Sequence, residues 1–326
     1  MRWALMDEKH SEICIIGGGM AGLACARSLK AAGRDVRVLD KGRGPGGRMA
    51  ARRAEVAGAQ VSFDHGAQYF TARDAGFQAA VAGWEAAGVV ARWPAAGEEA
   101  WVGIPGMNAP IKAMAAELDV RWNVRASAVM RAGEGWRIEA EGAEYTANTV
   151  LMAVPAEQAR DLLAEPAPLL AQVPAGVTSQ PCWAVMASFA ETLSGLSDCL
   201  RDAEAKISWA ARNSAKPGRA GPDGSAENWV LHASPERSRE ILDLPKEETV
   251  KVLLADFFAQ VGLEPVEPIH CVAHRWLYAQ PASIKGEPAR YDPQARIGIA
   301  GDYLHSPRVE GAFVSGSALA QLVLGG

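Results

Sequence analysis

The sequence predicts an α/β fold with a second part built mainly on antiparallel strands, and three observations lead to this prediction. Near the N-terminus, the apolar residues 13–16 run into a cluster of glycines, and a helical pattern follows over 23–32. An apolar strand followed by a helix returns at 296–324. Between these segments, residues 178–290 contain short runs that are typical of antiparallel strands. The 326 residues exceed the usual size of a single core, so we expect one large domain or two interwoven ones.

The composition argues against several classes of protein. Hydrophobic residues make up 49% of the chain and charged residues 22%, as in ordinary globular proteins. The net charge of −5 argues against a nucleic-acid-binding protein, which usually has a basic face. No stretch approaches the roughly 20 apolar residues of a membrane span. Residues 1–10 have no apolar core and predict a frayed leader rather than a signal peptide. Five scattered cysteines without a Cys-x-x-Cys pair favour reduced thiols, a cytoplasmic location and no metal site.

The first glycine cluster has the spacing of a dinucleotide-binding turn. In Gly17-x-Gly19-x-x-Gly22, the first glycine makes the turn, the second lets phosphates approach the backbone, and the third lets the helix pack closely. The N-terminus of the following helix would face the negative charge. The spacing alone also occurs in turns that bind no ligand. Asp40 ends the next strand, 35–40, close to the spacing at which an acid hydrogen-bonds a ribose. The strand, the turn, the helix and the acid therefore all indicate nucleotide binding.

Later segments predict that the dinucleotide is FAD. A second glycine-rich segment, 41–49, follows the acidic strand directly, and Arg48 within it could lie near the cofactor. A flexible loop with a surface arginine is the alternative. Residues 63–71 place small residues between polar and aromatic ones, as expected where the backbone passes a flat ring. Gln68 and Tyr69 would be the neighbours of that ring.

The C-terminal segment supports the same prediction. Asp302 ends a strand, and its carboxylate could accept hydrogen bonds from ribityl hydroxyls. The helix that follows has small residues, Ala312 among them, where a ligand must come close. Its positive N-terminus could stabilise a reduced flavin.

The remaining segments are assigned by their periodicity. We expect helices over 74–92, 109–118, 156–162 and 245–261, a strand over 120–124 that continues through 126–130, and a meander formed by 136–140 and 144–146. We also expect a separate buried strand over 148–155, further strands over 183–189, 206–212, 228–233 and 270–278, and a mobile connection over 214–227.

The chain resembles the renalase family, within the FAD-dependent amine-oxidase-like flavoproteins. The resemblance rests on Gly17-x-Gly19-x-x-Gly22, Asp40-Lys41 with Gly46-Gly47-Arg48-Met49, Asp64-x-Gly66-Ala67-Gln68-Tyr69-Phe70-Thr71, and Gly301-Asp302 with Gly311. It implies a Rossmann-type FAD-binding domain interwoven with a substrate domain on a mainly antiparallel sheet, in a p-hydroxybenzoate hydroxylase-like topology. The expected FAD domain comprises 1–72, 106–165 and 291–326, and the substrate domain comprises 73–105 and 166–290.

The resemblance also implies the residues that contact the cofactor. FAD would be bound without a covalent link, because the last helix contains no cysteine. The expected contacts are Gly17, Gly19, Met20, Ala21, Gly22, Asp40, Lys41, Gly47, Arg48, Met49, Gly66, Ala67, Gln68, Tyr69, Ala126, Gly301, Asp302, Val309 and Ala312.

The activity implied by the resemblance is the oxidation of 2- and 6-dihydro isomers of NAD(P) to NAD(P)+, with oxygen reduced to hydrogen peroxide. His232, Trp276 and Tyr69 would position this substrate. A FAD-dependent amine oxidase or a desaturase is the main alternative, and a non-catalytic FAD-binding protein is the third. The sequence carries no signal that decides between NAD and NADP or that sets the oligomeric state.

Overall fold

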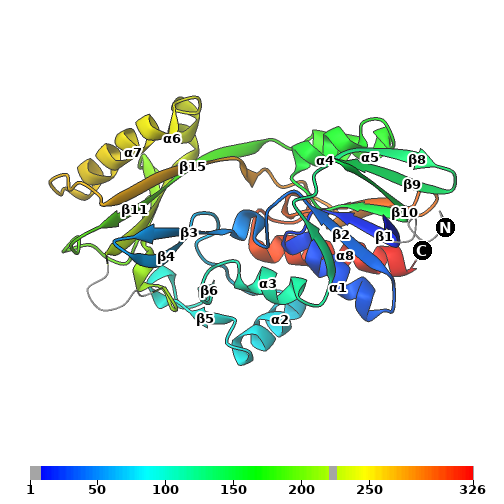
Figure 1. Ribbon diagram of the computed structural model, residues 1–326, viewed down its shortest axis with the longest axis horizontal. Helices are drawn as coiled ribbons and strands as arrows, with labels where there is room; N and C mark the ends of the chain where they lie inside the picture. Colours follow the sequence, from blue (N-terminus) through cyan, green and yellow to red (C-terminus); the bar gives the residue numbers. More distant parts are fainter. Residues whose placement is uncertain (1–8, 220–225, 326) are drawn as a thin grey trace.

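The structure is a computed structural model that describes residues 9–219 and 226–325. It contains two large sheets at opposite ends of the molecule, with smaller hairpins and helices between them (Figure 1). Most of the predicted leader, residues 1–8, lies outside the described residues, and residue 10 already begins the first strand. None of the helices in the described part of the chain combines the length and the apolar character needed to cross a membrane.

The first sheet is mainly parallel, as expected for a Rossmann-type arrangement. Its strand order is β16-β17-β10-β1-β2-β7, with β8 and β9 added as an antiparallel extension of β10. The strands are β1 (His10–Ile16), β2 (Val36–Asp40), β7 (Asp119–Trp122), β8 (Ala126–Ala132), β9 (Gly135–Ala140), β10 (Ala143–Met152), β16 (Ala289–Asp292) and β17 (Ile297–Ala300). The carboxyl ends of β1, β2, β7, β10 and β17 therefore meet at one edge, where ligands of such sheets bind.

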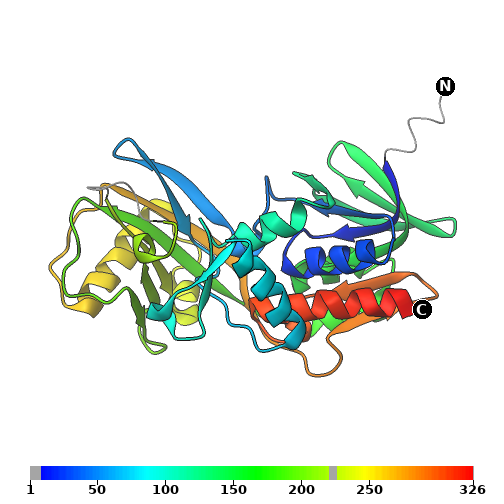
Figure 2. The same ribbon diagram turned by 90° about the horizontal axis from the view of Figure 1, so that it is seen from below.

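Helices cover both faces of this sheet because its central strand is apolar on both sides. In β1, Ile13 and Ile15 pack with α1 (Met20–Ala31) and α8 (Val309–Gly325). Cys14 and Ile16 face the opposite side, toward α4 (Ala156–Leu163) and α5 (Pro168–Ala175). Figure 2 shows α1 and α8 side by side. A side chain at Gly316 would collide with the Ala21 carbonyl, so glycine permits this close crossing.

The second sheet is antiparallel throughout, with strand order β12-β13-β14-β11-β15. Its strands are β11 (Ser179–Phe189), β12 (Cys199–Arg201), β13 (Ile207–Arg212), β14 (Glu227–Ala233) and β15 (His270–Pro281). Trp183 and Trp229 pack with Phe257 of α7 (Lys246–Val261), beside α6 (Pro235–Glu240). The other face contacts the hairpin of β3 (Ala51–Val56) and β4 (Ala59–Asp64), where Phe63 packs with Val230. The strands predicted over 183–189, 206–212, 228–233 and 270–278 are confirmed.

Three predictions of local structure are wrong. The helix expected over 74–92 ends early: α2 spans Ala75–Ala86, and β5 (Val90–Arg92) pairs with β6 (Trp101–Gly103). Gly88, at a φ of 69°, adopts the left-handed conformation that ends a helix. Residues 126–130 do not continue β7, because the chain turns at Asn123 (φ 60°) and forms a hairpin strand instead. The strands expected over 144–146 and 148–155 are one strand, β10.

The connection expected to be mobile over 214–227 is partly buried. Lys216 is 1% exposed and Arg219 is 7% exposed, and both form ion pairs with a buried aspartate. Residues 220–225 lie outside the described residues. The β3–β4 hairpin and β12 were not predicted. In β3, charged and apolar residues mix without a clear alternation, and β12 has only three residues, whereas β4 does alternate and its pattern was missed. The helix expected over 109–118 is present as α3 (Ala109–Ala115).

Candidate active site

A cavity of about 2170 Å³ lies between the two sheets. It is lined by the carboxyl ends of β1, β2 and β10 and by residues of β13, β14 and β15. Ordinary ligand pockets measure about 300–1,000 Å³, so this cavity has room for a dinucleotide and a second molecule. All the predicted site residues line it except Gly22: Gly17, Gly19, Met20, Ala21, Asp40, Lys41, Gly47, Arg48, Met49, Gly66, Ala67, Gln68, Tyr69, Ala126, His232, Trp276, Gly301, Asp302, Val309 and Ala312.

The glycine turn leaves an open cradle at the N-terminus of α1. Gly17 has a φ of 113°, and a side chain there would meet the Ala153 carbonyl. Gly22 lies behind the turn, where a side chain would meet the Gly17 carbonyl. By contrast, a Cβ at Gly19 would meet no described atom within 4 Å. Because the first N–H groups of a helix lack intrahelical partners, this open space suits a pyrophosphate.

Asp40 is oriented by two backbone groups. Its carboxylate oxygens accept hydrogen bonds from the N–H groups of Gly18 (2.7 Å) and Gly42 (2.6 Å). Lys41 beside it donates to Gln158 Oε1 (2.9 Å), and burial lowers the pKa of this lysine, with Arg125 contributing. The carboxylate thus joins both glycine-rich segments at the edge of the sheet, at the position expected for a ribose contact.

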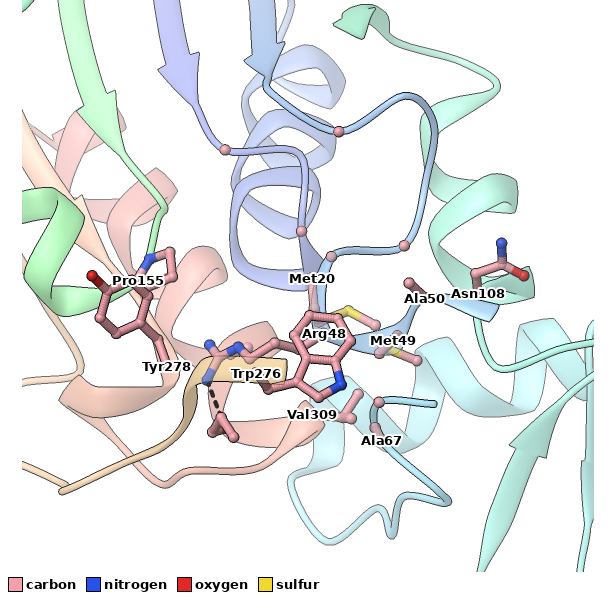
Figure 3. Close-up of a pocket in the computed structure, with 18 of the residues that line it drawn as sticks. Met20, Arg48, Met49, Ala50, Ala67, Asn108, Pro155, Trp276, Tyr278 and Val309 are labelled. Atoms are coloured by element: carbon pink, nitrogen blue, oxygen red, sulfur yellow. Dashed lines mark hydrogen bonds between the residues drawn. The ribbon is translucent and has the colours of Figure 1, made fainter. Parts of the chain in front are cut away.

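Arg48 and Asp302 form a two-pronged ion pair. Arg48 Nη1 and Nη2 lie 2.8 Å and 2.6 Å from the two carboxylate oxygens of Asp302. Figure 3 shows Arg48 beside Trp276 in the middle of the cavity, with Tyr278 and Pro155 on one side and Asn108 on the other. A side chain at Gly66 would meet the Arg48 carbonyl, so the segment predicted to pass a flat ring lies directly against the second glycine segment.

Three aromatic side chains form a compact group on the side of the cavity that the antiparallel sheet lines. The indole N–H of Trp276 donates to the His65 carbonyl (2.8 Å), and the two rings stack with centroids 5.2 Å apart. His274 meets both rings edge-on, at 4.8 Å and 4.4 Å. Burial lowers the pKa of His65 to about 4, with His274 and Arg52 adding to the effect. Burial and then Arg52 also lower the pKa of His274, so both imidazoles are neutral at pH 7.

Tyr69 is held by an arginine that the sequence analysis missed. The rings of Tyr69 and Trp209 stack with centroids 5.4 Å apart and an interplanar angle of 20°. Arg201 donates to the Tyr69 hydroxyl (2.9 Å), and its guanidinium lies 4.9 Å from the centre of the Trp209 ring. The aromatic pair therefore already has a cation against it.

A second group missed by the sequence analysis is a buried ion cluster next to Gln68. Asp64 Oδ2 lies 3.3 Å from Lys216 Nζ and 2.6 Å from Arg219 Nη2, and all three side chains are inaccessible to solvent. Asp64 Oδ1 accepts a hydrogen bond from the Met107 N–H (2.9 Å). Burial lowers the pKa of Lys216 to about 8, although Asp64 opposes this shift, so the lysine is protonated at pH 7. Pro217 and Gly218 made this segment look like a surface loop.

Carboxylates are distributed unevenly over the cavity, whereas cations line both sides of it. The carboxylates that line it belong to the side of the first sheet: Asp40, Asp161, Asp302 and Glu310. The side lined by the antiparallel sheet and the β3–β4 hairpin contributes cations and histidines: Arg52, Arg53, His65, His232, Lys246, His274 and Arg275. Among the described residues, that side contributes no lining carboxylate. The field there favours an anionic or neutral ligand over a cation.

Fold and site together define a dinucleotide-binding protein with a separate antiparallel sheet. Residues 15–82 match the model of the NAD(P)-binding Rossmann-like domain, and residues 89–324 match that of flavin containing amine oxidoreductases. The chain belongs to the family of flavin-containing amine oxidoreductases. It is a FAD-dependent oxidoreductase, and the open cradle at Gly19 fits that cofactor.

Solved structures share the fold at low sequence identity. A protein described as a candidate protoporphyrinogen oxidase from Exiguobacterium sp. 255-15 has a TM-score of 0.74 at 14% identity, covering 98% of this chain and 100% of that one. Putrescine oxidase bound to putrescine has a TM-score of 0.72 at 15% identity, with coverages of 97% and 99%. Cyclohexylamine oxidase from Brevibacterium oxydans IH-35A has a TM-score of 0.63 at 14% identity, with coverages of 96% and 98%.

Proposed function

We propose that the protein is a renalase-like oxidase of isomeric dihydro-NAD(P), which converts 2- or 6-dihydronicotinamide forms to NAD(P)+. One dihydronicotinamide, one dioxygen and one proton would yield one NAD(P)+ and one hydrogen peroxide. The observation that carries the proposal is the charge of the cavity: the side lined by the antiparallel sheet contains cations and neutral imidazoles and, within the described residues, no carboxylate. A phosphate-bearing dinucleotide suits this field, whereas a protonated amine is repelled by it.

The aromatic pair supports the same choice. An amine-binding cage would present open aromatic faces to a substrate cation. Here the faces of Tyr69 and Trp209 lie against each other, and Arg201 occupies the adjacent cation position. A protonated amine bound at this position would therefore lie close to the guanidinium of Arg201, which carries the same charge.

The chain's own residues would act by binding and positioning. The Gly17–Gly22 turn would hold the FAD pyrophosphate, and Asp40 would hold a ribose, while the segment containing Gln68 would lie along the flavin ring. FAD, when bound, supplies a two-electron acceptor that oxygen can reoxidise. Trp276 and Tyr69 would position the dihydropyridine and exclude water from it. A dihydropyridine can lose hydride without a protein base, which agrees with the low pKa values of the cavity histidines.

The proposal includes the finer organisation of the chain. The FAD-binding domain would comprise 1–72, 106–165 and 291–326, and the substrate domain 73–105 and 166–290, in a p-hydroxybenzoate hydroxylase-like topology. FAD would be bound non-covalently, and the protein would work in the cytoplasm.

An anaerobic titration tests the substrate. The FAD-loaded protein would be mixed with 2-dihydro-NAD, 6-dihydro-NAD, ordinary NADH and putrescine while the flavin absorbance is recorded. We expect one or both isomers to bleach the flavin when one molar equivalent per flavin has been added. We expect NADH and putrescine to leave the flavin oxidised. A flavin that stays oxidised with both isomers would rule out the proposal.

An amine oxidase is the second candidate, because the family model and the putrescine-bound neighbour both point to amines. Peroxide release with a panel of primary and secondary amines measures this directly. Rapid peroxide release with an amine, together with no response to the dihydronicotinamides, would replace the first proposal with the second.

Arg52 provides a test of phosphate recognition. Its side chain is exposed and lines the cavity, and Arg52 and Lys246 both lower the pKa of His274, so both cations lie near this imidazole. We expect Arg52→Glu to raise the KM for the dinucleotide about 10-fold, equivalent to about 1.4 kcal/mol. The matching dihydronicotinamide riboside, which lacks phosphate, should show little change. Arg27→Glu, on the exposed side of α1, is the control. Equal effects on both substrates would contradict a phosphate contact.

A further inference from the structure

The side-chain amide of Gln68 lies between a buried lysine and a cavity histidine. Lys216 Nζ is 3.0 Å from Gln68 Oε1, and Gln68 Nε2 is 3.3 Å from His232 Nε2. An ammonium group can only donate hydrogen bonds, so the oxygen of the amide must face Lys216. The amide nitrogen then faces the carbonyls of Asp64 and Gly66 as well as the imidazole, and all three are groups that can accept.

This orientation determines the protonation pattern of His232. An amide NH₂ only donates, so His232 Nε2 must be the unprotonated, accepting nitrogen, and in the neutral ring the proton sits on Nδ1. Burial, followed by the charge of Lys216, lowers the pKa of His232 to about 4, while a backbone hydrogen bond with His65 acts in the opposite direction. The ring is therefore neutral at pH 7.

Lys216 is itself held rigidly. Its ammonium lies 3.3 Å from Asp64 Oδ2 and 3.1 Å from the Gln68 carbonyl, and its side chain is inaccessible to solvent. Arg219 and the Met107 N–H fix the two oxygens of Asp64. Lys216 is absent from the lining of the cavity, whereas Gln68 and His232 belong to it. Lys216 therefore reaches the cavity by hydrogen bonding only through Gln68, in addition to the through-space effect of its charge on His232.

We propose that Lys216 is a positioning residue that fixes the amide of Gln68 and, through it, holds His232 with its proton on Nδ1. His232 then has no Nε2 proton to offer a ligand, and this wall of the cavity has one defined hydrogen-bonding pattern. The inference concerns the chain's own residues and does not depend on the identity of the substrate.

Nitrogen NMR of the FAD-loaded protein with isotope-labelled histidine tests the proposal, since protonated and unprotonated ring nitrogens have well-separated shifts. The His232 signals are assigned from a His232→Gln variant. In the native protein we expect a protonated Nδ1 and an unprotonated Nε2 for His232. Lys216→Met leaves Asp64 paired with Arg219 alone and removes the donor to Gln68. In this variant we expect the signal of His232 Nε2 to move toward the protonated position. The side-chain amide of Gln68 can then rotate and present its oxygen to His232.

Two further variants make the test specific. Lys216→Arg keeps a donor and should retain much of the native pattern, and Lys251→Met, an exposed position on α7, should leave it unchanged. If Lys216→Met does not fold, Gln68→Met removes the amide instead and should likewise release the proton from Nδ1. A native His232 protonated on Nε2, or a pattern that neither folded variant alters, would overturn the proposal.

Discussion

Asp64→Ala is expected to lower the free energy of unfolding by about 3–5 kcal/mol, because it leaves two buried cations without their carboxylate. Lys216 and Arg219 both pair with Asp64, and all three side chains are inaccessible to solvent. The loss also removes the acceptor of the Met107 N–H. Urea unfolding followed by tryptophan fluorescence, with and without FAD, measures the change.

Two comparisons separate the buried charges from a general effect of mutation. Asp243→Ala changes a side chain that is 97% exposed, so it should alter the free energy of unfolding by less than about 0.5 kcal/mol. The triple variant Asp64→Leu, Lys216→Met, Arg219→Met replaces the whole cluster by apolar groups and should be more stable than Asp64→Ala alone. An Asp64→Ala protein as stable as the native one would show that the cations find other partners.

Gly19→Val should weaken FAD binding strongly while leaving the fold intact. Gly19 has a φ of −83°, which any residue adopts, and a Cβ there meets no described atom within 4 Å. The added methyl groups would instead occupy the space through which phosphates approach the turn. We expect the Kd for FAD to rise at least about 100-fold, or about 2.7 kcal/mol, as measured by fluorescence titration of the apoprotein.

The stability of the apoprotein is the decisive companion measurement. Gly19→Val should unfold at the same urea concentration as the native apoprotein, and Gly83→Val, where a side chain also meets nothing, should bind FAD normally. Gly17→Val should lose both FAD binding and stability toward urea, because Gly17 combines a φ of 113° with a collision against Ala153. Tight FAD binding by a folded Gly19→Val protein would place the pyrophosphate elsewhere.

Local signals account for the parts of the fold that were predicted from sequence. The strand, glycine turn and helix at the N-terminus form within about 20 consecutive residues, and the backbone freedom of Gly17 is a property of that position alone. The antiparallel strands β11, β13 and β14 were predicted because their apolar residues are contiguous. Two of the three wrong predictions fall where a turn residue, Gly88 or Asn123, interrupts an otherwise continuous pattern, and the third divided the continuous strand β10 into two.

The sequence by itself determined the dinucleotide turn, the mixture of parallel and antiparallel segments, and the resemblance that led to FAD. Only the tertiary structure decided the environment of Gln68 and Tyr69 in the cavity. Gln68 meets Lys216 and His232 across 148 and 164 residues of chain, and Tyr69 meets Arg201 across 132. No local pattern marks such partners, because burial and pairing of a charge depend on which segments pack together. In the sequence Lys216 lies in a polar, proline- and glycine-containing stretch, and only the packing of that stretch against Asp64 makes it a buried cation.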